Sequence, residues 1–178
     1  MAHTAIATYL ADHLAGSTAG VELARRVARN NDGGPRGQTL SQLVREIEAD
    51  RETLKQLMAE LDVRGSRGKN ALAWIMERTR RLKPNGRLGG DGSMQRLHDL
   101  EALSLGIAGK GAMWVALRAT PEIASRTQID LDELDARARD QRERVERERL
   151  EAARVALVPS PGSRRPQHDT RPAPRNAP

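Results

Sequence analysis

The stretch LDELDARARDQRERVERERLEAARVAL, residues 131–157, decides the fold. Mostly small or apolar residues recur in it at alternating intervals of three and four, the spacing of one face of an α-helix. This face comprises Leu131, Leu134, Ala138, Gln141, Val145, Glu148, Ala152 and Val155. The other faces alternate Arg with Glu or Asp, so we favour a solvated outer helix with a narrow packing stripe over a dimerising coiled coil. Asp130 and Glu133 have capping-box spacing, which predicts that the helix starts at Leu131.

Helical periodicity also covers most of the remaining chain. It predicts helices over about 4–30, 39–61, 69–82 and 94–119, and Pro121 is suited to open a short helical turn. Thr39 and Gln42 again have capping-box spacing, which places the second helix start at Thr39. Residues 94–119 are apolar around most of the helix circumference, so we expect them to form the most buried element. No segment shows a strand pattern that we would defend.

The amino-acid composition limits both the fold classes and the cellular compartments that are plausible for this chain. The 178 residues include no Cys, no Phe, two Trp and one Tyr, which excludes disulfides, thiolate metal sites and a cysteine nucleophile. A core of Leu, Ala, Val, Ile and Met favours helices over strands. Asp12 and His13 interrupt the apolar amino-terminal stretch, and residues 102–117 are short and rich in small residues, so we expect neither a signal peptide nor a membrane span. We therefore expect a cytoplasmic protein of bacterial type without a membrane partner.

Together these elements predict an all-α, antiparallel four-helix bundle with one extra short helix. The bundle domain would span residues 1–158, and the Pro- and Arg-rich residues 159–178 would form a disordered tail. The small residues 15–20 of the first helix, and Gly106, Gly109 and Gly111 of the fourth, are expected where two helix backbones approach closely. Leu at Gly16 or at Gly109 would then overpack the interface.

Besides Gln141 and Glu148 on the stripe described above, three polar residues fall inside the apolar arcs of other predicted helices: His13, Asp50 and Glu101. Helical bundles form metal sites from inward carboxylates and imidazoles, so these residues are our candidate ligands for iron, manganese or zinc. The alternative, which we favour, is that the buried polar groups are internal ion pairs, with Arg51, Lys110 or His13 as partners, because an unpaired buried charge is very costly. On that interpretation the protein carries no cofactor.

This layout, two helical hairpins with inward His and carboxylate residues over about residues 4–157, resembles the ferritin-like bundle superfamily. The resemblance implies a ferritin-like fold, and in the di-metal members of that superfamily it implies Glu-x-x-His pairs. The nearest string here, His98-Asp99-Leu100-Glu101, reverses that order. The sequence is therefore compatible with a metal-free member of this superfamily, or with a member that has an incomplete metal site at His13, Asp50 and Glu101.

The charge distribution suggests another partner class. The chain carries a formal charge of +6, and residues 62–90 hold eight basic and two acidic side chains. The candidate surface for nucleic acid or another anionic partner consists of Arg78, Arg80, Arg81, Lys83 and Arg87, together with the tail. No recognised DNA- or RNA-binding motif accompanies it, and an Arg bias from GC-rich coding would give the same pattern.

No group of residues has the spacing of a catalytic site. Gly109-Lys110-Gly111 lacks the Ser or Thr that a phosphate loop needs after its Lys. No serine stands in a nucleophile context with His13 or His98. We therefore expect a non-enzymatic structural or partner-binding protein, whose partner is another protein or a second copy of the chain.

Overall fold

The computed structural model describes residues 2–31, 33–63 and 92–158, and these residues are helical apart from short turns. The described elements are four long helices, α1 (Ala2–Arg29), α2 (Gly34–Glu60), α4 (Ser93–Arg118) and α6 (Leu131–Ala156), and one short helix, α5 (Pro121–Ala124), between α4 and α6. The described residues contain no strand. The all-α prediction is therefore confirmed. The predicted helix at 69–82 and the tail at 159–178 lie outside the described residues.

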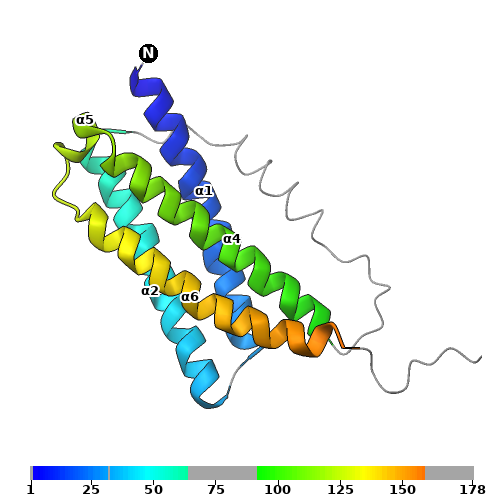
Figure 1. The fold of residues 1–178 in the computed structure, drawn as a ribbon. Helices are drawn as coiled ribbons and strands as arrows, with labels where there is room; N and C mark the ends of the chain where they lie inside the picture. Colours follow the sequence, from blue (N-terminus) through cyan, green and yellow to red (C-terminus); the bar gives the residue numbers. More distant parts are fainter. Residues whose placement is uncertain (1, 32, 64–91, 159–178) are drawn as a thin grey trace, which may run out of the picture.

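The long helices form two hairpins, α1 with α2 and α4 with α6, and the second hairpin lies against the first (Figure 1). Side-chain contacts give the helix directions. Glu148, near the end of α6, bonds both Arg36 at the start of α2 and Arg96 at the start of α4. Arg126, just before α6, donates to the carbonyl of Leu61 at the end of α2. Thus α2 and α4 run in the same direction, and α6 runs opposite to both.

Aliphatic side chains from all four long helices fill the centre. The largest side chains that are fully shielded from solvent are Trp114, Leu10, Leu43, Leu57, Leu61, Leu100, Met113, Leu117, Gln141 and Val145. Burial of apolar surface contributes about 25 cal/mol for each Å² removed from water, so the burial of these side chains is the main driving force for folding. Gln141 is the polar exception, and it marks the position of a buried polar network.

The start of α6 follows the prediction closely. The Asp130 carboxylate accepts a hydrogen bond from the Glu133 backbone N–H at 2.9 Å, and α6 begins at Leu131. The predicted packing stripe is buried from Leu131 to Val145 and again at Ala152. Val155 is 60% exposed, so the stripe ends before the helix does. The narrow stripe follows because, among the described helices, α6 has neighbours on one side only.

The predicted start of α2 at Thr39 is wrong. The helix begins at Gly34 with Pro35 in its first turn, and the Thr39 hydroxyl donates to the Pro35 carbonyl at 3.1 Å from inside the helix. Proline suits this position because its fixed φ is helical and its missing N–H would have no partner there. Gly33, with φ at 117°, supplies the left-handed turn before it. The Gly-Gly-Pro sequence therefore opens α2 rather than only ending α1.

Of the two expectations for α4, the first is confirmed and the second holds in part. With nine buried residues, against eight in α2 and seven in α6, α4 is the most buried long helix. It still has an uncovered side, since Leu105 is 74% and Val115 is 39% exposed. A Cβ built at Gly106 or Gly109 meets nothing within 4 Å, so the predicted close approach is wrong at these two positions. At Gly111 a built Cβ would lie 3.5 Å from the Ala138 Cβ of α6, so this predicted glycine does face a neighbouring helix. An apolar helix with two neighbours keeps one apolar face uncovered, and sequence periodicity does not reveal which face that is.

Candidate functional site

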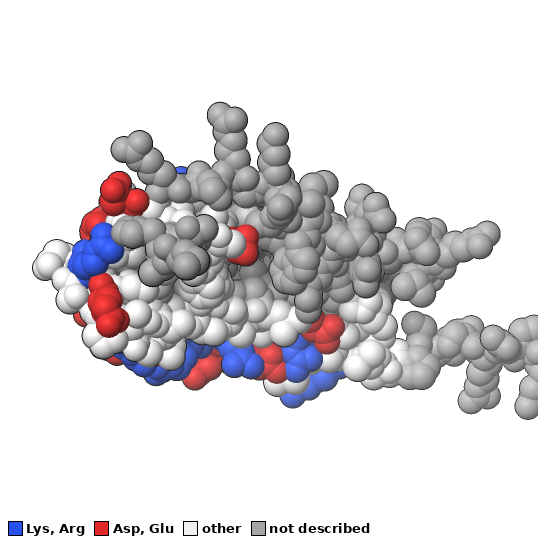
Figure 2. All heavy atoms as spheres, turned by 90° about the horizontal axis from the view of Figure 1, so that it is seen from above, with Lys and Arg blue, Asp and Glu red and all other residues white. Residues whose placement is uncertain are grey.

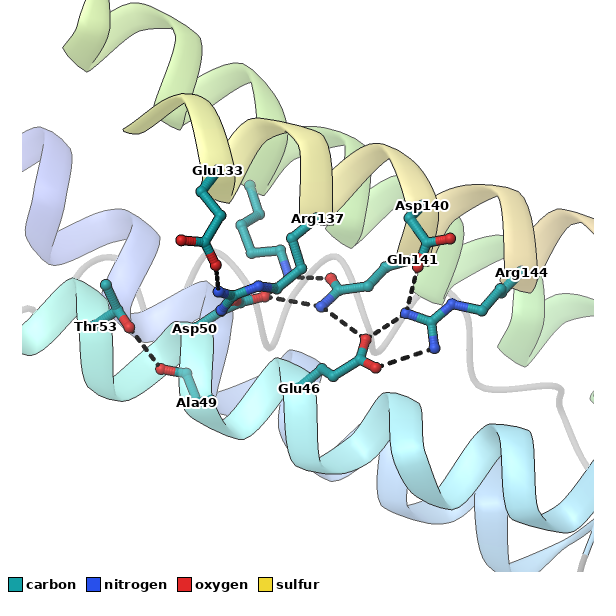
Figure 3. A network of polar contacts seen from close by, with 10 residues as sticks. Glu46, Ala49, Asp50, Thr53, Glu133, Arg137, Asp140, Gln141 and Arg144 are labelled. Carbon is teal, nitrogen blue, oxygen red and sulfur yellow. Dashed lines mark hydrogen bonds and ion pairs between the residues drawn. The ribbon is translucent and has the colours of Figure 1, made fainter. Parts of the chain in front are cut away.

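Asp50 of α2 is the centre of a polar network that joins three helices (Figure 3). Its carboxylate is 2% exposed and accepts hydrogen bonds from Arg137 at 3.0 Å and from Gln141 at 3.0 Å, both on α6. Lys110 of α4 donates to the same carboxylate at 2.5 Å. The sequence predicts that Asp50 faces inward and that Lys110 is one of its possible partners. Both predictions are confirmed.

Lys110 has a second partner in the same network. Its ammonium donates to the Gln141 side-chain carbonyl at 2.5 Å, while the amide of Gln141 donates to Asp50. Burial lowers the pKa of Lys110, and the charge and hydrogen bond of Asp50 oppose that effect. The three side chains therefore form a closed triangle of hydrogen bonds around one buried ion pair.

The network continues toward solvent through Glu46, one helical turn before Asp50. Arg144 donates to both carboxylate oxygens of Glu46, and Gln141 donates to it at 3.4 Å. Burial alone would raise the pKa of Glu46, but Arg144, Gln42 and Gln141 together lower it. Arg144 is also held by Asp140 at 2.8 Å, and Arg137 pairs with Glu133. Lys110, Arg137 and Arg144 are thus each paired with at least one carboxylate of this network.

This arrangement suits a structural role better than a chemical one. The Asp50 carboxylate already accepts three hydrogen bonds, from Arg137, Gln141 and Lys110. A buried network in which every polar group has a hydrogen-bond partner disfavours other helix registers, because a shift of one helix along another would leave a charge unpaired in the core. The network therefore fixes how α2, α4 and α6 align.

The structure does not bring the three predicted metal ligands together. Glu101 lies at the edge of α4 with its side chain 44% exposed, 3.6 Å from Arg149. His13 is half-buried on α1 and lies edge-on to Tyr9, with 4.6 Å between the ring centroids. Among the described residues, no group of three or more His, Asp and Glu side chains is placed to hold a metal ion. The Asp50 carboxylate is paired with Lys110 and Arg137 instead. At His13, burial lowers the pKa of the imidazole, and the charge of Asp12 opposes that effect.

A second polar cluster, at the opposite end of α4, was missed by the sequence analysis. Asp99 is buried and receives a two-point contact from Arg26 of α1, at 2.9 and 3.0 Å. Gln95 donates to the same carboxylate at 2.7 Å. Nearby, Glu148 of α6 bridges Arg36 and Arg96. The sequence signal that could have predicted this cluster is the charge pattern near the helix ends. There Asp99 and Glu148 each pair with an arginine of the α1–α2 hairpin.

The predicted anionic-partner surface lies outside the described residues. This applies to Arg78, Arg80, Arg81, Lys83 and Arg87, and to the tail, so the structure does not describe their arrangement. Within the described surface, a shallow hollow lies at the start of α2. It is lined by Gly33, Gly34, Gly37, Gln38, Ser41 and Arg45, which include no pair of acid and base groups.

The exposed side of α4 is the most distinctive surface feature. Exposed residues between positions 105 and 116 are all uncharged: Leu105, Gly106, Gly109, Ala112, Val115 and Ala116. Figure 2 shows acidic and basic side chains along one long edge of the molecule and a broad uncharged area beside it. In the described part of the chain, α4 is the one helix long and apolar enough to span a membrane by composition, with 33% of its most apolar window buried. Core helices of soluble proteins pass the same test, so this finding identifies an apolar face and nothing further.

Comparison with known proteins gave no relative. No family model, curated protein or solved structure matched this chain.

Proposed function

We propose that this protein is a non-enzymatic, ferritin-like helical bundle of the cytoplasm that acts as a structural, partner-binding protein through the exposed face of α4. The ferritin-like assignment is supported by two hairpins whose middle helices, α2 and α4, run in the same direction and are joined by a long connection. The lack of cysteine agrees with a reducing compartment.

One observation carries the proposal. The outer face of α4 is defined by His98, Ala102, Leu105, Gly109, Ala112, Ala116 and Ala119, which recur at intervals of three and four. From Leu105 onward, every residue of this face is exposed. This spacing is what one helix presents to another in coiled-coil packing, and small residues allow close approach of the two axes. We refer to these seven residues as the α4 outer face.

The framework behind this face supports a scaffold role. The Asp50 network and the Arg26–Asp99 pair hold α4 against the other hairpin at two separate levels. A helix held at two levels presents its outer face in a fixed orientation, which lowers the entropic cost of docking a second helix. The class of partner is an α-helix with apolar residues at the same spacing.

The test compares Leu105→Glu with the matched control Val155→Glu on α6. Both side chains are exposed, at 74% and 60%, so a face that meets only water should tolerate either change within about 0.5 kcal/mol. If a helix of this chain or of a second copy docks on the α4 outer face, Leu105→Glu should lower the free energy of unfolding by about 2 kcal/mol, because a carboxylate would be buried without a partner. Urea titration of the full-length protein gives both values. Equal, small effects in the two variants would contradict docking by the chain itself or by a second copy.

A further inference from the structure

The α4 outer face is itself a helix surface with apolar residues at the spacing that its partner needs. Resting on the proposed function, we propose that the partner helix is α4 of a second copy of this chain, docked antiparallel so that a two-fold axis relates the two copies. Three features of the described residues support this partner: the side-chain sizes along the face, the absence of charge on it, and the charged pairs near the two ends of α4.

The side-chain sizes along this face are self-complementary. Leu105 and Val115 are the two large hydrophobic residues of α4 that are exposed. An antiparallel second copy related by a two-fold axis beside Lys110 places Leu105 opposite Ala116 of that copy. The same axis places Val115 opposite Ala108. Each large side chain therefore meets an alanine, and two-fold symmetry makes every such contact twice.

The centre of the face carries the smallest residues. The two-fold axis places Gly109 of one copy opposite Ala112 of the other. A Cβ built at Gly109 meets nothing within 4 Å, so the described chain leaves its outer side open. The distance between the axes of packed helices, about 8–10 Å, is shortest where the side chains at the contact are small. A centre of Gly and Ala therefore lets the Leu105 side chains on either side of it reach the helix of the second copy.

No charge on this face opposes the pairing of two identical copies. The chain carries a formal charge of +6, so many encounters between copies bring like charges together. The exposed residues from Leu105 to Ala116 are uncharged, and the ammonium of Lys110 is directed inward to Asp50. The outer sides of α2 and α6 instead carry exposed charges such as Lys55 and Arg139. The α4 outer face therefore lets a second copy dock without burying an unpaired charge.

Charged pairs near the ends of α4 favour the antiparallel direction. Glu101, whose side chain is 44% exposed, lies near the start of α4 and pairs with Arg149 at 3.6 Å. Arg118, whose side chain is 38% exposed, ends α4 and pairs with Asp132. Antiparallel docking brings Glu101 of one copy level with Arg118 of the other, whereas parallel docking would bring like charges level with each other. Opposed helix dipoles add to the same preference.

The native chain contains no Cys, so engineered disulfides report contacts between copies without background. The test mixes two full-length single variants, Ala102→Cys and Ala119→Cys. The proposed axis places these positions opposite each other, and they lie about 25 Å apart along one helix. Disulfides form when two Cα atoms come within about 7 Å, so antiparallel docking gives a mixed disulfide and parallel docking gives disulfides between identical variants. Val155→Cys on α6, mixed with Ala102→Cys, is the control for random collision.

Sedimentation of the parent protein across the micromolar range gives its oligomeric state, alongside Leu105→Glu and the control Val155→Glu. Circular dichroism first confirms that each variant is helical. The proposal predicts a reversible dimer for the parent and for Val155→Glu. In Leu105→Glu the dissociation constant of the dimer should rise at least about tenfold, because a carboxylate would lie against an apolar helix. The mixed disulfide should be the main covalent product.

A parent protein that stays monomeric at every concentration would overturn the proposal. Disulfides between identical variants, or a dimer that Leu105→Glu leaves unchanged, would overturn it as well. The proposed function has a separate measurement: a labelled helical peptide with Ala and Leu at the spacing of the α4 outer face, titrated into the parent and into Leu105→Glu. Binding of this peptide to a monomeric parent, lost in Leu105→Glu, would reject only the second copy as partner. No dimer and no peptide binding would reject the docking face itself.

Discussion

Lys110 of α4 donates a hydrogen bond to Asp50 of α2 at 2.5 Å, and this ion pair is one of the few links between the two hairpins that is shielded from water. The Lys110 side chain is 15% exposed and the Asp50 side chain 2%. Gln141 of α6 bonds both residues, so the pair fixes three helices at once. A buried pair of this type contributes specificity of alignment more than net stability, because desolvation offsets much of its attraction.

The helix cap predicted from sequence and confirmed in the structure gives the first test. Asp130→Ala should lower the free energy of unfolding by about 1 kcal/mol, since the Glu133 N–H loses its acceptor. Thr39→Ala is the control, because Thr39 has the same sequence spacing to Gln42 but lies inside α2. Its effect should stay within about 0.5 kcal/mol. Chemical denaturation measures both, and equal losses would show that α2 starts at Thr39 after all.

Two glycines give opposite predictions. Gly106→Ala should stabilise the protein by about 0.5–1 kcal/mol, because the position is helical and its new Cβ meets nothing within 4 Å. Gly33→Ala should destabilise it by at least about 1 kcal/mol, because its φ of 117° is strained for any residue with a Cβ. Melting temperatures of the two variants against the parent decide this. A gain of stability in Gly33→Ala would contradict the observed turn.

Glu46 should make stability depend on acid pH. Its pKa is lowered in the folded protein, so the unfolded chain binds the proton more readily, and the contribution is present above about pH 4.3 and is lost as the pH falls through the folded-state value. With the side chain 22% exposed, screening limits the effect to about 1 kcal/mol. The difference in urea midpoint between the parent and Glu46→Gln should therefore shrink between pH 6 and pH 3. A constant difference would show that Arg144 does not stabilise the ionised form.

His13 should make the stability of the protein depend on pH in a milder range than Glu46 does. Burial lowers its pKa, so the folded protein prefers the neutral imidazole, and stability declines as the pH falls below about 6.5, the value in the unfolded chain. His13→Gln should abolish the part of the decline between pH 7 and pH 5. Thermal melts at intervals of half a pH unit would measure it. An unchanged profile would assign the decline to other groups.

Much of this fold could be predicted from the sequence because several local signals agreed. Asp130 with Glu133 marked the start of α6, Pro121 marked α5, and the stripe from Leu131 to Val145 identified the packed face. The beginning of α2 could not be settled, because Gly33-Gly34-Pro35 suits both the end of one helix and the start of the next. Tertiary context decides between such alternatives.

The candidate site was predictable only in part. Asp50 falls within an unambiguous apolar arc of α2, so its burial followed from periodicity. On α4 the apolar residues surround the helix, so periodicity does not distinguish the buried arc from the exposed arc on which Glu101 and Val115 lie. Val115 is 39% exposed, and Glu101 accordingly lies at the surface. The partners of Asp99 and Glu148 depend on helix directions, which periodicity does not contain.

The most direct test of the structural role of the network is a double-mutant cycle between Asp50 and Lys110, measured by urea unfolding at pH 7. Asp50→Leu should cost about 3 kcal/mol, because it leaves the buried Lys110 without a carboxylate partner, and Lys110→Met should cost less, because Asp50 keeps its ion pair with Arg137. The exposed control Lys55→Met should cost less than about 0.5 kcal/mol. The double variant should cost less than the sum of the two, with a coupling energy of about 1–3 kcal/mol. Additive costs would contradict the account, because they would mean that Lys110 does not hold Asp50 in the folded protein.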